Sequence, residues 1–162
     1  KPERPWRHGV AFWLTRPDGA VLLRRRPERG LLGGMIEIPS TPWRERPWSL
    51  KEALAEAPAA VPWSPLPGTV QHGFTHFRLE LAIVAGRSEA GDGFSGSPRD
   101  PVARGWGLWS PVERLGEHAL PSLMKKLVRH AVSVLAPTDY AGAANSGGIA
   151  SAARRTGAKE RR

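Results

Sequence analysis

The chain opens with two strand-like segments joined by a tight turn, and this pairing restricts the possible folds more than any other feature of the sequence. Between positions 8 and 16, Val10, Phe12 and Leu14 alternate with other residues, as on one face of a strand. Pro17-Asp18-Gly19 then predicts a turn, because proline presets φ and glycine accepts a positive φ. Residues 20–26 return as a second strand, so we expect an antiparallel hairpin.

More strands and loops are expected further along the chain. Apolar stretches bounded by Gly and Pro predict short strands over 35–39, 69–72, 77–85 and 107–109. The first of these places one carboxylate, Glu37, inside an apolar run. Proline-rich residues 58–67 and polar residues 87–104 are expected to be loops.

Two main helices complete the expected fold. Ser49 and Glu52 have the spacing of a capping box, which predicts a helix that runs to about Ala57. Pro111 suggests the first residue of another short helix. Apolar residues recur at helical spacing over 120–135, with Lys125, Lys126 and Arg129 outside. The order of elements predicts an α/β (α+β) domain with a mixed β-sheet packed by two main helices.

The composition changes after Pro137 to mostly Ala, Gly, Ser, Asn and Arg. We therefore expect residues 1–136 to form one domain and residues 137–162 to be a disordered basic tail. The chain begins at Lys1 rather than at a methionine, so we expect it to be a piece of a longer protein.

The charge balance points to a polyanionic partner. The sequence has 24 Lys and Arg against 15 Asp and Glu, and its pI is about 11.2, which suits nucleic acid or an anionic membrane surface. No apolar run approaches the roughly 20 residues that a membrane span needs, and no signal peptide opens the chain. Cysteine is absent, which excludes disulfides and iron–sulfur clusters within these residues. A cytoplasmic protein that acts on nucleic acid is the simplest fit.

Residues 71–79 read Gln-His-Gly-Phe-Thr-His-Phe-Arg-Leu and combine groups that suit the recognition of a nucleobase. Aromatic rings stack on bases, and a hydroxyl both donates and accepts hydrogen bonds. The same residues also fit a plain hairpin with two phenylalanines in the core and two histidines on the surface. The segment alone does not separate these two interpretations.

Several segments together resemble the C-terminal domain of bacterial adenine DNA glycosylases. They are residues 30–39, residues 72–79, Trp109-Ser110-Pro111 and residues 119–126, and the resemblance extends over roughly residues 8–135. It implies a Nudix-hydrolase-like fold that reads 8-oxoguanine opposite adenine in double-stranded DNA. It also implies an upstream glycosylase domain of the same polypeptide, with the catalytic carboxylates and an iron–sulfur cluster, in the bacterial cytoplasm. No catalytic residue, cofactor or metal is then expected within this chain.

The resemblance assigns the base-reading role to the segment around Gly73. The hydroxyl of Thr75 would accept a hydrogen bond from N7–H of 8-oxoguanine, a donor that guanine lacks. Phe74 would fill the space beside the lesion, and Gly73 would allow a positive φ and a close approach to DNA. His72 and His76 would contact phosphates or brace the loop.

Arginines are the candidate phosphate contacts, and Glu37 is expected to be a structural partner beneath its strand. The candidates are Arg24, Arg25, Arg26, Arg29 and Arg78.

An active Nudix pyrophosphohydrolase is the rival interpretation. That activity needs a helical Arg-Glu-x-x-Glu-Glu cluster whose carboxylates hold divalent cations. Here the helix offers only Glu52 and Glu56, and Glu52 is already part of the capping box. A metal site at His72 and His76 lacks an evident third ligand. A generic nucleic-acid-binding module and a protein-interaction domain also remain open.

Overall fold

The opening hairpin forms as the sequence predicts. In the computed structural model, which describes residues 3–89 and 99–135, β1 (Trp6–Thr15) is followed by the antiparallel strand β2 (Ala20–Arg25). Gly19 has a φ of 89°, and the Asp18 carboxylate accepts a hydrogen bond from the Ala20 N–H at 3.0 Å. The turn therefore uses the two residues that the sequence singles out.

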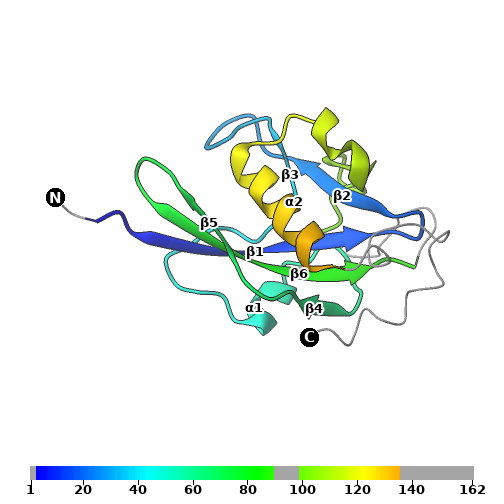
Figure 1. Ribbon diagram of the computed structural model, residues 1–162, viewed down its shortest axis with the longest axis horizontal. Coiled ribbons are helices and arrows are strands. Elements are labelled where there is room, and N and C mark those ends of the chain that lie inside the picture. The colour runs from blue at the N-terminus through cyan, green and yellow to red at the C-terminus, as the bar shows by residue number, and fades with distance from the viewer. Residues whose placement is uncertain (1–2, 90–98, 136–162) are drawn as a thin grey trace.

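A mixed seven-stranded sheet is built around this hairpin (Figure 1). The short strand β3 (Ile36–Glu37) and β7 (Gly107–Pro111) both pair antiparallel with β2, and both strands were expected. The long strand β6 (Arg78–Arg87) pairs parallel with β1 along its whole length, from Trp6 opposite Arg78 to Thr15 opposite Arg87. This parallel pairing brings the start of β1 next to the start of β6.

The opposite edge of β6 is shared by two short strands. β5 (Val70–Gly73) forms the expected hairpin with β6. β4 (Trp63–Pro65) lies within residues 58–67, so the prediction of a loop there is wrong. Proline cannot donate to a ladder, but β4 pairs only with β6 and tolerates Pro65 as an edge strand does.

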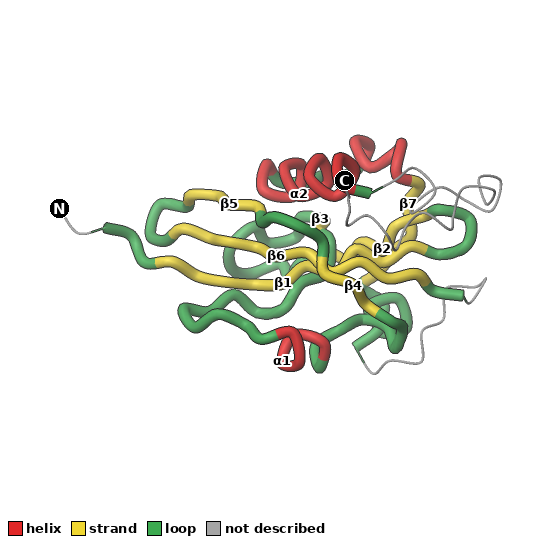
Figure 2. Tube along the Cα trace, turned by 60° about the horizontal axis from the view of Figure 1, so that its bottom comes forward, coloured by secondary structure: helices red, strands yellow, loops and turns green. Residues whose placement is uncertain are grey.

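Each face of the sheet is covered by one of the predicted helices (Figure 2). α2 (Ser122–Val134) buries Leu123, Met124, Leu127 and Ala131 in the main core. α1 (Leu50–Leu54) covers the other face, where Ala53 packs with β1 and β6 residues. α1 ends before Ala57 because the following amides bond three residues back, as in a tight last turn.

The remaining expectations are met in part. The short helix near Pro111 is a 3₁₀ helix over Val112–Glu117, and Pro111 precedes it instead of being its first residue. The expected tail, residues 137–162, and part of the expected loop, residues 90–98, lie outside the described residues. In the part of the chain that the structure describes, the helices are too short to cross a membrane.

Candidate nucleic-acid interface

The β5–β6 turn presents two polar side chains at its tip. The Phe74 N–H donates to the Phe77 carbonyl at 2.8 Å, which closes a four-residue turn between the paired residues Gly73 and Arg78. Thr75 and His76 occupy the two middle positions, and both are exposed. Within residues 3–89 and 99–135, the Thr75 hydroxyl has no hydrogen-bond partner. It is therefore free to bond an incoming group.

Aromatic packing fixes the base of the turn. The Phe74 ring lies 5.9 Å from the Trp43 ring in a stacked arrangement and 4.8 Å from the ring of Phe77, which is buried. The Arg4 guanidinium donates to the Phe74 carbonyl at 2.5 Å. Phe74 thus faces inward and supports the turn. Its contact with the oxidised base stays a prediction.

The two histidines do not share a face. His72 lies in β5 with its ring centroid 5.0 Å from that of Phe74 in an edge-to-face arrangement, whereas His76 lies at the tip of the turn. Nδ1 of His72 is buried and has no hydrogen-bond partner in the described residues. Burial lowers the pKa of His72 below its usual value, and the positive charge of Lys126 lowers it further.

Gly73 does not use the positive φ that a glycine permits. It is not among the described glycines with positive φ. A Cβ at this position would lie 3.4 Å from Nη1 of Arg4, close to an ordinary van der Waals contact. Gly73 is the last residue of β5 and is held in the strand by its pairing with Arg78.

An exposed cation, Arg78, and a half-buried one, Arg7, lie beside the turn. Arg78 follows it directly and lies over the ring of Trp6 at 5.5 Å. Arg7 lies over the ring of Phe77 at 4.3 Å. Sequence reasoning missed Arg4 and Arg7, because only the parallel pairing of β1 with β6 brings them to the turn.

The other predicted phosphate contacts lie away from the turn. Arg24 and Arg26 bind the two carboxylate oxygens of Glu37 at 2.8 and 2.9 Å, and Glu37 is only 2% exposed. Glu37 is thus the structural partner that the sequence predicts. Arg25 donates to the Gly34 carbonyl at 3.1 Å, and Arg29 is exposed on the loop after β2.

A cleft of about 640 Å³ lies beside these arginines. Trp43 lies between the cleft and the turn, because its ring contacts Phe74 and is covered by the Arg26 guanidinium at 4.8 Å. The charged and tryptophan side chains that line the cleft are Arg7, Arg24, Arg25, Arg26, Arg99, Arg104, Glu37, Glu56, Trp43 and Trp106. Six cations against two carboxylates give the cleft an excess of positive charge.

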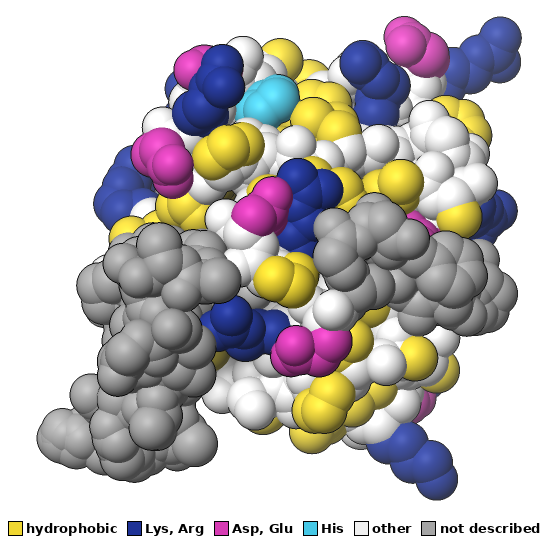
Figure 3. Space-filling view, turned by 90° about the vertical axis from the view of Figure 1, so that its right-hand side faces the viewer, with side chains coloured by type: hydrophobic (Ala, Val, Ile, Leu, Met, Phe, Trp, Pro, Cys, Tyr) yellow, Lys and Arg dark blue, Asp and Glu magenta, His cyan; other side chains and the backbone are white. Residues whose placement is uncertain are grey.

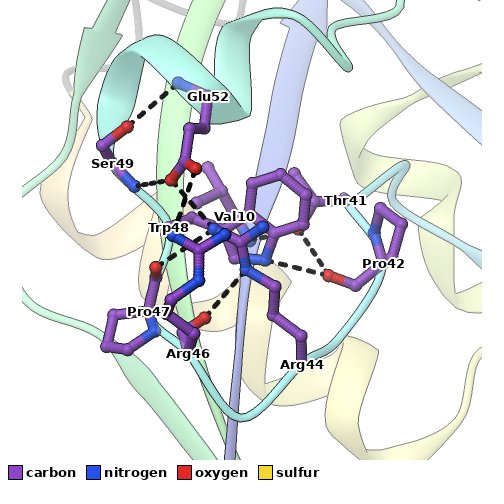
Figure 4. A network of polar contacts seen from close by, with 9 residues as sticks. All are labelled: Val10, Thr41, Pro42, Arg44, Arg46, Pro47, Trp48, Ser49 and Glu52. Carbon is purple, nitrogen blue, oxygen red and sulfur yellow. Dashed lines mark hydrogen bonds and ion pairs between the residues drawn. The ribbon is translucent and has the colours of Figure 1, made fainter.

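Glu52 and Glu56, the two carboxylates weighed as metal ligands, are both engaged by backbone or arginine groups. The Ser49 N–H and the Arg44 guanidinium both donate to the Glu52 carboxylate, at 3.0 and 2.8 Å (Figure 4). These bonds lower the pKa of Glu52 to about 2, and the bond from Ser49 has the largest effect. Glu56 pairs with Arg99 at 3.4 Å. A magnesium site needs carboxylate oxygens that converge on the ion. Among residues 3–89 and 99–135, no three His, Asp or Glu side chains converge in this way.

The sequence and the fold are similar to those of known proteins. The sequence matches the family described as the NUDIX domain over residues 10–130, and no curated protein sequence matches it. The solved MutT protein from Methanosarcina mazei Go1 is 20% identical with a TM-score of 0.63, over 82% of this chain and 97% of that one.

Two further solved structures are also similar. The C-terminal domain of mouse MUTYH, in complex with human PCNA, is 22% identical with a TM-score of 0.56, over 78% of this chain and 88% of that one. The NUDIX domain of Shewanella oneidensis NrtR, complexed with ADP ribose, is 18% identical with a TM-score of 0.55, over 82% and 89%. At these identities the likeness shows the fold alone.

Proposed function

The chain belongs to the NUDIX domain family, and from this premise we propose that it is a DNA-repair module that recognises 8-oxoguanine opposite adenine. In this proposal it is the C-terminal domain of a bacterial, cytoplasmic adenine DNA glycosylase. An upstream domain of the same polypeptide removes the adenine and carries the iron–sulfur cluster. The chain's own residues bind the DNA and read the oxidised base.

The observation that carries the proposal is the exposed Thr75 hydroxyl on a turn held by aromatic packing. 8-Oxoguanine has a hydrogen at N7, where guanine has only an acceptor. A hydroxyl accepts from that hydrogen, and Phe74 and Phe77 support the turn that carries Thr75. Arg4 and Arg78 beside the turn supply positive charge for the phosphates.

Binding to matched duplexes tests this role. We expect the chain to bind a duplex with 8-oxoguanine opposite adenine more tightly than one with guanine opposite adenine. Thr75→Ala should remove about 1–2 kcal/mol of that preference, or about tenfold, because one neutral hydrogen bond is lost. Thr75→Ser keeps the hydroxyl and is the matched control, so it should retain most of the preference.

Two outcomes would contradict the proposal. Equal affinity of the wild-type chain for both duplexes would indicate a generic nucleic-acid-binding module. An unchanged preference in a folded Thr75→Ala variant would show that another residue reads the base.

Nucleotide hydrolysis is the second candidate, because Glu37 and Glu56 both line the positively charged cleft. We expect no turnover of 8-oxo-dGTP or other nucleotides with Mg²⁺ or Mn²⁺, since arginines already engage both carboxylates. Phosphate and pyrophosphate release would be measured. Turnover that disappears in Glu56→Gln or Glu52→Gln would support a Nudix hydrolase instead.

A further inference from the structure

The lysines and arginines of this chain differ in whether a carboxylate neutralises them. Seven of the described arginines pair with Asp or Glu side chains; these are Arg16, Arg24, Arg26, Arg44, Arg46, Arg99 and Arg114. On the end of the molecule shown in Figure 3, basic side chains likewise lie beside acidic ones. Such pairs have little charge left for an external anion.

The outer side of α2 is different. The helix contains Lys125, Lys126 and Arg129 and no acidic residue, and all three cations are exposed. None of them forms an ion pair with any residue in the described ranges 3–89 and 99–135. Their charge is therefore available to a partner.

Two of these cations line a groove of about 420 Å³ between α2 and β5, which lie side by side (Figures 1 and 2). Lys126 Nζ donates to the Gln71 carbonyl at 3.2 Å, which fixes the ammonium group and leaves two of its hydrogens free. Arg129 brings a full guanidinium. Thr69, His130 and Ser133 add polar atoms to the same groove.

One carboxylate lies beside the groove. Glu80 of β6 accepts hydrogen bonds from the side chains of Thr69 and Gln71, at 3.4 and 3.3 Å. It also pairs with His8 at 3.3 Å. Glu80 keeps its negative charge in the bonds to Thr69 and Gln71, so the charge balance beside the groove depends on Lys126 and Arg129, which outnumber this carboxylate.

The groove lies close to the β5–β6 turn. Gln71, which lines the groove and holds Lys126, precedes Thr75 by four residues, so the two are at most roughly 13 Å apart along the chain. A DNA duplex rises about 3.4 Å per base pair, so this span corresponds to about four base-pair steps. One duplex can therefore contact the turn and the groove together.

We propose that the groove between α2 and β5 binds the phosphate backbone of the DNA beside the base read at the turn, with Lys126 and Arg129 as the contacting residues. This inference rests on the proposed function. It adds a second DNA-binding surface, the groove beside α2, to the β5–β6 turn. Phosphate contacts do not distinguish bases, so this surface should add affinity without specificity.

The test is a DNA titration with the full chain at several salt concentrations. Lys126→Gln and Arg129→Gln should each weaken binding several-fold. Each should also reduce the slope of log K against log salt by about 0.9, because one phosphate contact is lost. Both duplexes, with 8-oxoguanine or with guanine opposite adenine, should weaken by the same factor.

Lys51→Gln is the matched control, because it removes one exposed charge from α1 on the opposite face of the sheet. It should leave the slope unchanged.

If Arg129→Gln and Lys126→Gln behave like Lys51→Gln while the wild type still prefers 8-oxoguanine, the groove inference is wrong and the proposed function stands. If the slope falls as expected but the wild type shows no preference, the groove is confirmed and the proposed function fails. Absence of DNA binding by the wild type would overturn both.

Discussion

His72 shows how burial and a nearby cation act together on one side chain of the hairpin. Its pKa is lowered by burial first and by Lys126 second. In the unfolded chain the imidazole regains its usual pKa of about 6.5, so the unfolded state binds the proton more readily. The free energy of unfolding therefore falls as the pH drops below about 6.5, until the pH passes the lower pKa of the folded state.

We predict that His72→Gln reduces the loss of stability between about pH 7.5 and pH 5, because glutamine does not titrate there. Urea unfolding at a series of pH values measures this difference. His76→Gln is the matched control, since His76 is exposed at the tip of the same turn. Identical pH profiles for the wild type and His72→Gln would contradict the prediction.

The same histidine reports on the position of Lys126. Lys126→Gln removes the positive charge that disfavours the imidazolium, so the pKa of His72 should rise toward its usual value. A titration of the imidazole by NMR measures the shift. An unchanged pKa would show that the Lys126 ammonium lies away from His72 in solution.

The short helix α1 is stabilised at its first turn by a capping box. It is five residues long, and its capping box joins the Ser49 hydroxyl to the Glu52 N–H at 3.1 Å and the Glu52 carboxylate to the Ser49 N–H. The carboxylate is ionised above its lowered pKa of about 2, so its contribution is complete above about pH 4.5 and is lost as the pH falls through 2.

Ser49→Ala should lower the free energy of unfolding by about 1 kcal/mol at pH 7, within a range of 0.5–2. Ser122→Ala serves as the control, because Pro121 occupies the cap position of α2 and no side chain caps that helix. Urea unfolding of both variants measures the difference. Equal effects of the two substitutions would mean that the capping box adds no stability.

Elements encoded by neighbouring residues could be predicted from the sequence. The capping box, the Pro17–Gly19 turn and the β5–β6 hairpin each depend on residues within a few positions of each other. The placement of Thr75 at an exposed tip belongs to this group, because Gly73 and the flanking strands already mark a hairpin.

Features that depend on distant pairings could not be predicted in this way. The parallel register of β1 against β6 sets Arg4 and Arg7 beside the turn, although about 70 residues separate them from it. β4 was missed because Pro65 and the short length of the strand are typical of a loop, and only the pairing with β6 makes it a strand. The stacking of Trp43 on Phe74 likewise follows from the way residues 40–44 run along β1.

Across the whole molecule, Trp43 connects the sheet, the cleft and the turn. Its ring stacks on Phe74, lies under the Arg26 guanidinium that pairs with Glu37, and closely approaches Gly9 of β1. A substitution at Gly9 should therefore change the conformation of the β5–β6 turn through Trp43, although Gly9 is not part of that turn.

Gly9→Ala tests this connection. A Cβ at Gly9 would lie 2.7 Å from Cδ1 of Trp43 and 2.9 Å from Cδ2 of Leu81, so the indole must move. We predict a loss of about 1–3 kcal/mol in the free energy of unfolding, together with shifts in the NMR resonances of Thr75 and His76. Gly116→Ala is the control, because nothing lies within 4 Å of its added Cβ and its backbone is not left-handed. Destabilisation without any shift at the turn would mean that Trp43 moves independently of Phe74. Shifts at Thr75 and His76 would mean that the position of the Thr75 hydroxyl is set from the centre of the sheet.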